Sequence, residues 1–129
     1  MNPYTWGRVV ASILILNDED TIRGLLRSAL VTVEHEVSEA VNGRQGLELY
    51  HHWPTDLVIR DIHMPELNGL DILLEMTCEC LNAKVIAIAG AEGEANVLDV
   101  AKLLGARQTF QKPFDMPQVL NAVRYELEH

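Results

Sequence analysis

The chain is poor in cysteine, in aromatic residues and in basic residues, and it has no long hydrophobic run. Its two cysteines, Cys78 and Cys80, lie two positions apart on an expected helix, so their side chains point to different sides and do not easily pair. A metal site at these two cysteines is not expected either, because no second pair of ligands accompanies them. We interpret them as reduced thiols of a cytoplasmic protein.

The charge balance is acidic. The 129 residues include 10 Lys and Arg against 19 Asp and Glu, which gives a net charge of -9 at pH 7. The basic residues are scattered, so no basic patch can displace counterions from a nucleic-acid backbone, and direct nucleic-acid binding is not expected. No apolar stretch reaches transmembrane length and no signal-peptide pattern is present, so we expect no membrane partner.

Glycine-rich phosphate-binding motifs are also missing. No Gly-x-Gly-x-x-Gly follows the first expected strand, which disfavours a dinucleotide-binding fold. The stretch Gly90-Ala91-Glu92-Gly93 has no Lys-Ser or Lys-Thr after it, so it is not a P-loop. We expect a plain mobile loop over 90–96, with its two glycines as hinges.

A regular alternation of strand and helix patterns is present instead. Expected strands span residues 12–17, 35–40, 56–61, 84–89 and 107–111, and expected helices span 20–32, 43–52, 68–80, 94–104 and 115–126. Such alternation predicts an α/β fold of the flavodoxin-like type, a doubly wound five-stranded parallel sheet with five helices on both faces. The first, third and fourth strands are almost purely apolar and should be central, whereas the second alternates and should be an edge.

The expected domain covers residues 12–126. Residues 1–11 are interpreted as a loose N-terminal arm, and 127–129 resemble the start of a vector-encoded histidine tag. Helix boundaries agree with this division: Asn42 and Asp115 are expected caps, and Gly105 is an expected helix stop.

Charged residues gather where three strands end. Asp61 closes the apolar run 56–61 and is followed by a Pro/Gly loop, Asp18 follows the first strand, and Lys112 follows the fifth. Strand C-termini of an open parallel sheet line one edge, which is where ligands bind. The sequence therefore predicts that these three side chains surround one crevice.

These stretches together resemble the receiver domain of bacterial two-component response regulators. The resemblance extends from about residue 13 to about 123 and is carried by four motifs in the right order and spacing. They are the acidic cluster at 17–20, the Asp-x-x-Met-Pro-x-x-x-Gly segment from Asp61, Gly105-Ala106 and Lys112-Pro113-Phe114.

The resemblance implies a role for each matching residue. Asp61 matches the phosphoacceptor, Asp18 a metal ligand, and the backbone carbonyl of His63 a third protein ligand for Mg²⁺, the implied cofactor. Lys112 matches the lysine that holds a phosphoryl oxygen, and its bond to Pro113 is implied to be cis. Such a domain accepts and slowly loses a phosphoryl group and is not a conventional enzyme.

Three positions depart from the family pattern. Asn17 stands where an acid is usual, so it is expected to ligate the metal weakly or through water. Ala89 replaces a Ser or Thr that donates to the phosphoryl group, and Thr109 replaces an aromatic ring that moves with it. Phe110 should face the opposite side of its strand and belong to the core. Both halves of the usual switch are therefore missing.

Two functions from different classes follow. The first is a phosphoacceptor receiver with an atypical switch, served by a histidine kinase or phosphotransfer partner and acting on an output domain or effector protein. The second is a phosphorylation-independent pseudo-receiver that works as a protein-interaction module, favoured by Asn17, Ala89 and Thr109. A flavodoxin-like enzyme or cofactor binder has no motif in its favour.

Overall fold

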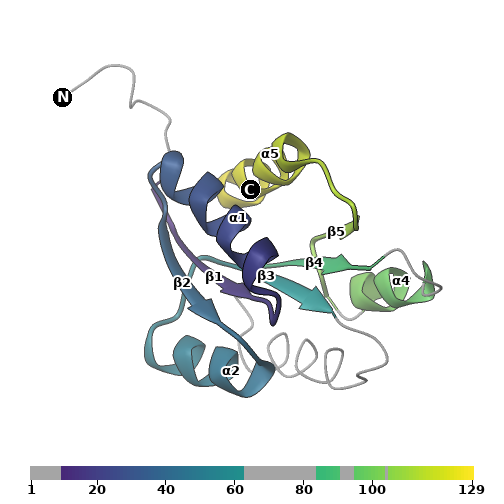
Figure 1. The fold of residues 1–129 in the computed structure, drawn as a ribbon, viewed down its shortest axis with the longest axis horizontal. Helices are drawn as coiled ribbons and strands as arrows, with labels where there is room; N and C mark the ends of the chain where they lie inside the picture. The colour runs from purple at the N-terminus through teal and green to yellow at the C-terminus, as the bar shows by residue number, and fades with distance from the viewer. Residues whose placement is uncertain (1–9, 63–83, 91–94, 104) are drawn as a thin grey trace.

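A computed structural model describes residues 10–62, 84–90, 95–103 and 105–129 (Figure 1). It contains a five-stranded, all-parallel sheet in the order β2-β1-β3-β4-β5. The strands are β1 (Ser12–Leu16), β2 (Glu36–Ala40), β3 (Leu57–Ile62), β4 (Val85–Ala89) and β5 (Gln108–Gln111). The described helices are α1 (Asp20–Thr32), α2 (Gly43–His52), α4 (Ala95–Leu103) and α5 (Met116–Glu128).

This order confirms the expected fold class and the expected positions of the strands. The three apolar strands β1, β3 and β4 occupy the middle of the sheet, and the alternating strand β2 forms one edge. The helix expected over 68–80, with its two cysteines, lies outside the described residues.

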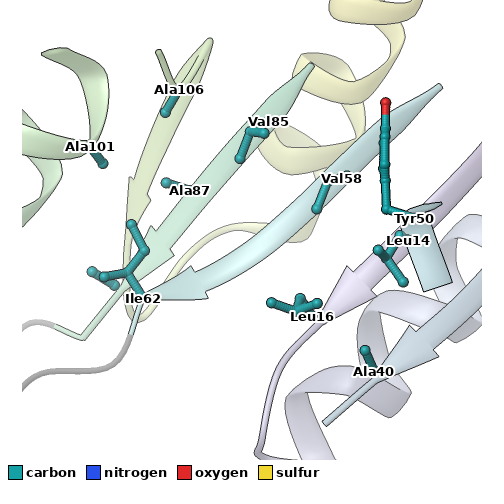
Figure 2. Close-up of a cluster of buried hydrophobic side chains, with 11 residues drawn as sticks. Leu14, Leu16, Ala40, Tyr50, Val58, Ile62, Val85, Ala87, Ala101 and Ala106 are labelled. Carbon is teal, nitrogen blue, oxygen red and sulfur yellow. The ribbon is translucent and has the colours of Figure 1, made fainter. Parts of the chain in front are cut away.

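The described helices cover both faces of the sheet, with α1 and α5 on one face and α2 and α4 on the other (Figure 1). The residues of β1 alternate between two apolar clusters: Leu14 and Leu16 face α2 and α4, whereas Ile13 and Ile15 face α1 and α5. Figure 2 shows the first of these clusters, with Tyr50 of α2 beside the inner strands. Because alternate residues of a strand point to opposite faces, a strand that is buried on both faces contributes side chains to two separate cores.

Two helix boundaries form as the sequence indicates. Asn42 caps α2, because its side-chain oxygen accepts a hydrogen bond from the Gln45 N–H at 2.8 Å. Gly105 follows α4 with a φ of 117°, a conformation that a Cβ would strain. Asp115 holds the N-cap position of α5, but its side chain makes no capping hydrogen bond.

Both ends of the packed domain extend beyond the expected limits. Ala11, which the sequence assigned to the arm, is buried, and its carbonyl accepts a hydrogen bond from the Glu36 N–H at 2.9 Å. Helix α5 continues to Glu128, and Leu127 packs against the core beneath α1 and α5. Across the described segments, no helix has the length and apolarity required to cross a membrane.

Candidate functional site

Asp61 lies close to the C-terminal edge of the sheet, on its central strand β3. The sequence suggested that Asp61 is the last residue of its strand. The strand also includes Ile62, so Asp61 is its penultimate residue. The residue is only 4% exposed. A carboxylate buried at this depth needs charged or hydrogen-bonding neighbours, because desolvation of an isolated charge is costly.

Lys112 provides such a neighbour from the end of β5, two strands away from β3 in the sheet. Its backbone N–H donates to the Ala89 carbonyl at 2.7 Å, which fixes the start of the segment after β5. The Lys112–Pro113 peptide bond is cis, as the family resemblance implied. The Lys112 Nζ donates to Asp61 Oδ2 at 2.7 Å and to Glu19 Oε1 at 3.0 Å. The sequence prediction that Asp61 and Lys112 meet at one edge is confirmed as geometry.

The charge state of Lys112 follows from these contacts. Burial alone would lower the pKa of its ammonium group, but the hydrogen bonds and negative charges of Asp61 and Glu19 outweigh burial and raise that pKa above the ordinary value. Lys112 is therefore a fixed positive charge beside the Asp61 carboxylate throughout the neutral pH range.

Three carboxylates gather at this edge. Asp18, Glu19 and Asp61 each offer an oxygen, and these atoms lie within 4.8 Å of one another. Asp18 was expected here, whereas Glu19 was not assigned a role from the sequence. Glu19 is exposed, and its carboxylate pairs with Lys112. Its position two residues after Asn17, at the start of α1, is the one signal that pointed to it.

Asn17 is the first residue after β1 and is buried, with 2% of its surface exposed. Its Oδ1 accepts the Glu19 N–H at 2.7 Å, so the side chain closes a turn that brings Glu19 towards Lys112. The sequence assigned Asn17 to the metal. The structure gives its amide oxygen this local hydrogen bond.

The two degenerate switch positions lie on the β4 and β5 side of the site. Ala89 is buried in the core under α2 and α4, and its side chain has no donor group. Thr109 pairs with Ala87 across the two strands, so it lies on that same face. Phe110 packs against the opposite core, under α1 and α5, which confirms that it is a core residue.

Arg60 was not singled out from the sequence. It is only 7% exposed and pairs with Leu16 on β1 and with Ala87 on β4, so it shares a cross-strand row with Thr109. A guanidinium group keeps its charge when buried. A positive charge therefore lies inside the sheet directly before Asp61, and the signal for it was one arginine in an otherwise apolar run.

Two predicted elements of the site fall outside the described residues. His63 was expected to offer its backbone carbonyl to a metal, and most of the loop 90–96 was expected to move.

Comparisons with known proteins identify the family of the chain. The family of the response regulator receiver domain matches residues 13–124. The chemotaxis protein CheY of Thermotoga maritima is 35% identical over 112 residues, which make up 86% of this chain and 92% of that protein. Sporulation initiation phosphotransferase F of Bacillus subtilis is 36% identical over 112 residues, or 87% of this chain and 90% of that protein.

A solved structure gives the same result. NtrX from Brucella abortus, in its complex with ADP, matches with a TM-score of 0.85 at 28% identity, over 93% of this chain. This chain spans only 26% of that NtrX chain, so the match concerns one part of a larger protein. The chain belongs to the response regulator receiver domain family of two-component signalling systems.

Proposed function

We propose that this receiver domain accepts a phosphoryl group on Asp61. The observation that carries the proposal is the contact of 2.7 Å between Lys112 Nζ and the buried Asp61 carboxylate, inside a cluster of three acids. A buried carboxylate with a fixed cation on one oxygen is oriented for reaction through the other. The same cation can hold a phosphoryl oxygen once the carboxylate has reacted.

The donor in this proposal is a phosphohistidine on a histidine kinase or a phosphotransfer protein. A carboxylate oxygen of Asp61 attacks the phosphorus, the new O–P bond forms, and the N–P bond of the phosphohistidine breaks. The electron pair of that bond stays on the imidazole, which takes a proton. Lys112 stabilises the charge on the transferred group, and hydrolysis of the acyl phosphate later restores Asp61. The domain is therefore a reactant and not a conventional enzyme.

Mg²⁺ is the cofactor that fits the donor set. Asp18, Glu19 and Asp61 present hard carboxylate oxygens close enough for one ion, and Mg²⁺ prefers such ligands together with water and phosphate oxygens. When bound, the ion neutralises charge between the acids and the incoming phosphoryl group. Glu19 can supply the negative charge that Asn17 lacks.

The domain is proposed to pass its signal to another protein or protein domain. This chain covers about a quarter of NtrX, so an attached output domain or a separate effector protein fits the comparison. The net charge of -9 disfavours nucleic acid as a direct partner.

The switch is proposed to be atypical. A signal requires a two-state element that the phosphoryl group biases. Neither Ala89 nor Thr109 can form the usual hydroxyl and aromatic pair, so the face made by α4, β5 and α5 should respond weakly. The pseudo-receiver that regulates by docking alone is the second candidate, and it rests on these same substitutions.

One experiment separates the two candidates. The wild-type protein and Asp61→Asn are incubated with acetyl phosphate and Mg²⁺, and intact masses are recorded. We expect a gain of one phosphoryl group in the wild type and none in the variant. An unmodified wild type would favour the pseudo-receiver, and an equal gain in the variant would reject Asp61 as the acceptor.

A second measurement tests the switch. Hydrogen exchange is compared with and without beryllium fluoride, which mimics a phosphoryl group on a carboxylate. Protection should rise around Asp61 and Lys112 and change little in α4 and α5. Changes of equal size in both regions would mean that a complete switch operates.

A further inference from the structure

Asn17 has one polar atom that makes no hydrogen bond to any described residue. Its backbone N–H donates to the Ala40 carbonyl at 3.0 Å, and its own carbonyl accepts from Arg23 Nη1 at 2.8 Å. Its Oδ1 accepts the Glu19 N–H at 2.7 Å. The remaining atom, Nδ2, is buried and makes no hydrogen bond within the described part of the chain.

The orientation of this amide is fixed by its neighbours. A reversed side chain would set the Nδ2 hydrogens against the Glu19 N–H, two donors facing each other. Nδ2 therefore stays on the other side of the group. Because it can only donate, it repels a cation, and its missing partner must be an acceptor.

Asn17 lies beside the site of reaction. The parallel register pairs Leu16 of β1 with Arg60 of β3. The residues that follow these two are Asn17 and Asp61, so they are neighbours across the two strands. Lys112 approaches Asp61 from the β5 side, and Ala89 offers no donor at the end of β4. A buried donor with no hydrogen bond among the described residues thus lies next to the Asp61 carboxylate.

We propose that Asn17 Nδ2 donates a hydrogen bond to a phosphoryl oxygen carried by Asp61. This inference rests on the proposed function and assigns Asn17 to the phosphoryl group, not to the metal. Lys112 and Asn17 then bind the group from β5 and β1, and the metal ligands are the carboxylates of Asp18, Glu19 and Asp61. The loss of the hydroxyl at position 89 is compensated by a donor that directly follows β1.

The direct test is the side-chain amide signal of Asn17 in a two-dimensional ¹H–¹⁵N spectrum of the whole chain. The signal is identified by its loss in Asn17→Asp. Beryllium fluoride is added at saturating Mg²⁺, and one Nδ2 proton is expected to move downfield. The amide of Asn42, which makes an analogous bond to the Gln45 N–H but lies outside the site, should not move.

Affinity gives the second readout. At saturating Mg²⁺, Asn17→Ala and Asn17→Asp should each bind beryllium fluoride about tenfold more weakly or worse, because each loses a hydrogen bond to a charged group. Asn42→Asp introduces the same charge and keeps the cap of α2, so it should bind like the wild type. Tighter or equal binding by Asn17→Asp under these conditions would mean that Asn17 is only a missing metal ligand, and it would overturn the inference.

The outcomes are separable from those of the proposed function. A wild type that gains a phosphoryl mass while its Asn17 amide stays unmoved by beryllium fluoride defeats this inference alone. A wild type that gains no mass defeats the proposed function and this inference with it. The amide shift is measured on the wild-type protein, so it decides the question even if the Asn17 variants do not fold.

Discussion

Replacing Lys112 by methionine should destabilise the fold through Asp61. The methionine keeps most of the apolar stem of the lysine but removes the ammonium group that lies 2.7 Å from the Asp61 carboxylate. The side chain of Asp61 is only 2% exposed, and Asp18 and Glu19 are close by. The variant therefore leaves a buried negative charge among other acids.

The size of the effect can be bounded in two ways. Removing one partner of a buried ion pair typically costs about 3–5 kcal/mol. Asp61 can also shed its charge by binding a proton, which costs about 4 kcal/mol at pH 7 for an ordinary aspartate and about 1.5 kcal/mol at pH 5. Because Lys112 is partly exposed, with 16% of its side chain accessible, we expect about 2–4 kcal/mol at pH 7.

The sign of the pH dependence follows from linkage. In the variant, the folded state binds a proton at Asp61 more readily than the unfolded chain does, so the destabilisation shrinks as the pH falls from 7 to 5. The double variant Asp61→Asn/Lys112→Met has no charge to bury. It should recover most of the loss at pH 7 and should lack this dependence on pH.

Urea unfolding followed by circular dichroism, without Mg²⁺, measures these differences. Lys102→Met on the exposed side of α4 is the matched control and should stay within about 0.5 kcal/mol of the wild type. The reasoning is refuted if Lys112→Met equals that control at pH 7. It is also refuted if Asp61→Asn fails to rescue the variant.

Two further predictions concern packing and pH. Gly46→Ala should destabilise the fold by about 1–2 kcal/mol, because its Cβ would lie 1.7 Å from Cδ1 of the buried Leu16. Gly24→Ala has open space around the new Cβ and should stabilise the fold by about 0.5–1 kcal/mol. Unfolding midpoints that change in the same direction in both variants would contradict this prediction. Burial lowers the pKa of His35 below 6.5, and its Nδ1 accepts the Ala11 N–H at 3.2 Å. The unfolded chain therefore binds a proton at His35 more readily than the folded protein does, so stability should fall as the pH drops below about 6.5. His35→Gln should show a shallower fall in stability between about pH 7.5 and 5.5. Identical slopes for the variant and the wild type would count against this prediction.

The local pattern of the sequence was enough to predict the architecture. Apolar runs with a period of two, separated by helical periods and by glycine or proline, specify each strand and helix through neighbouring residues alone. The composition of each strand also predicted its place, since β1 and β4 are apolar on both faces and β2 is not. The meeting of Asp61 and Lys112 followed from the rule that parallel strands end at one edge.

The details of the site depended on contacts between distant residues. Glu19 is separated from Lys112 by 93 positions in the sequence. Only the pairing of β1, β3, β4 and β5 in one sheet brings Lys112 Nζ to 3.0 Å from Glu19 Oε1. The direction of the Asn17 amide depends on one hydrogen bond to the Glu19 N–H, which residue types alone do not specify.

The sequence by itself thus determined the class of fold, the order of its elements and the two residues at the centre of the site, because these depend on periodicity and on which strands can be buried. The tertiary structure decided which acids face Lys112, where the unused Asn17 donor lies, and that Arg60 is buried within the sheet before Asp61. These features depend on distances of a few ångströms between side chains from different strands, and such distances exist only once the sheet has formed.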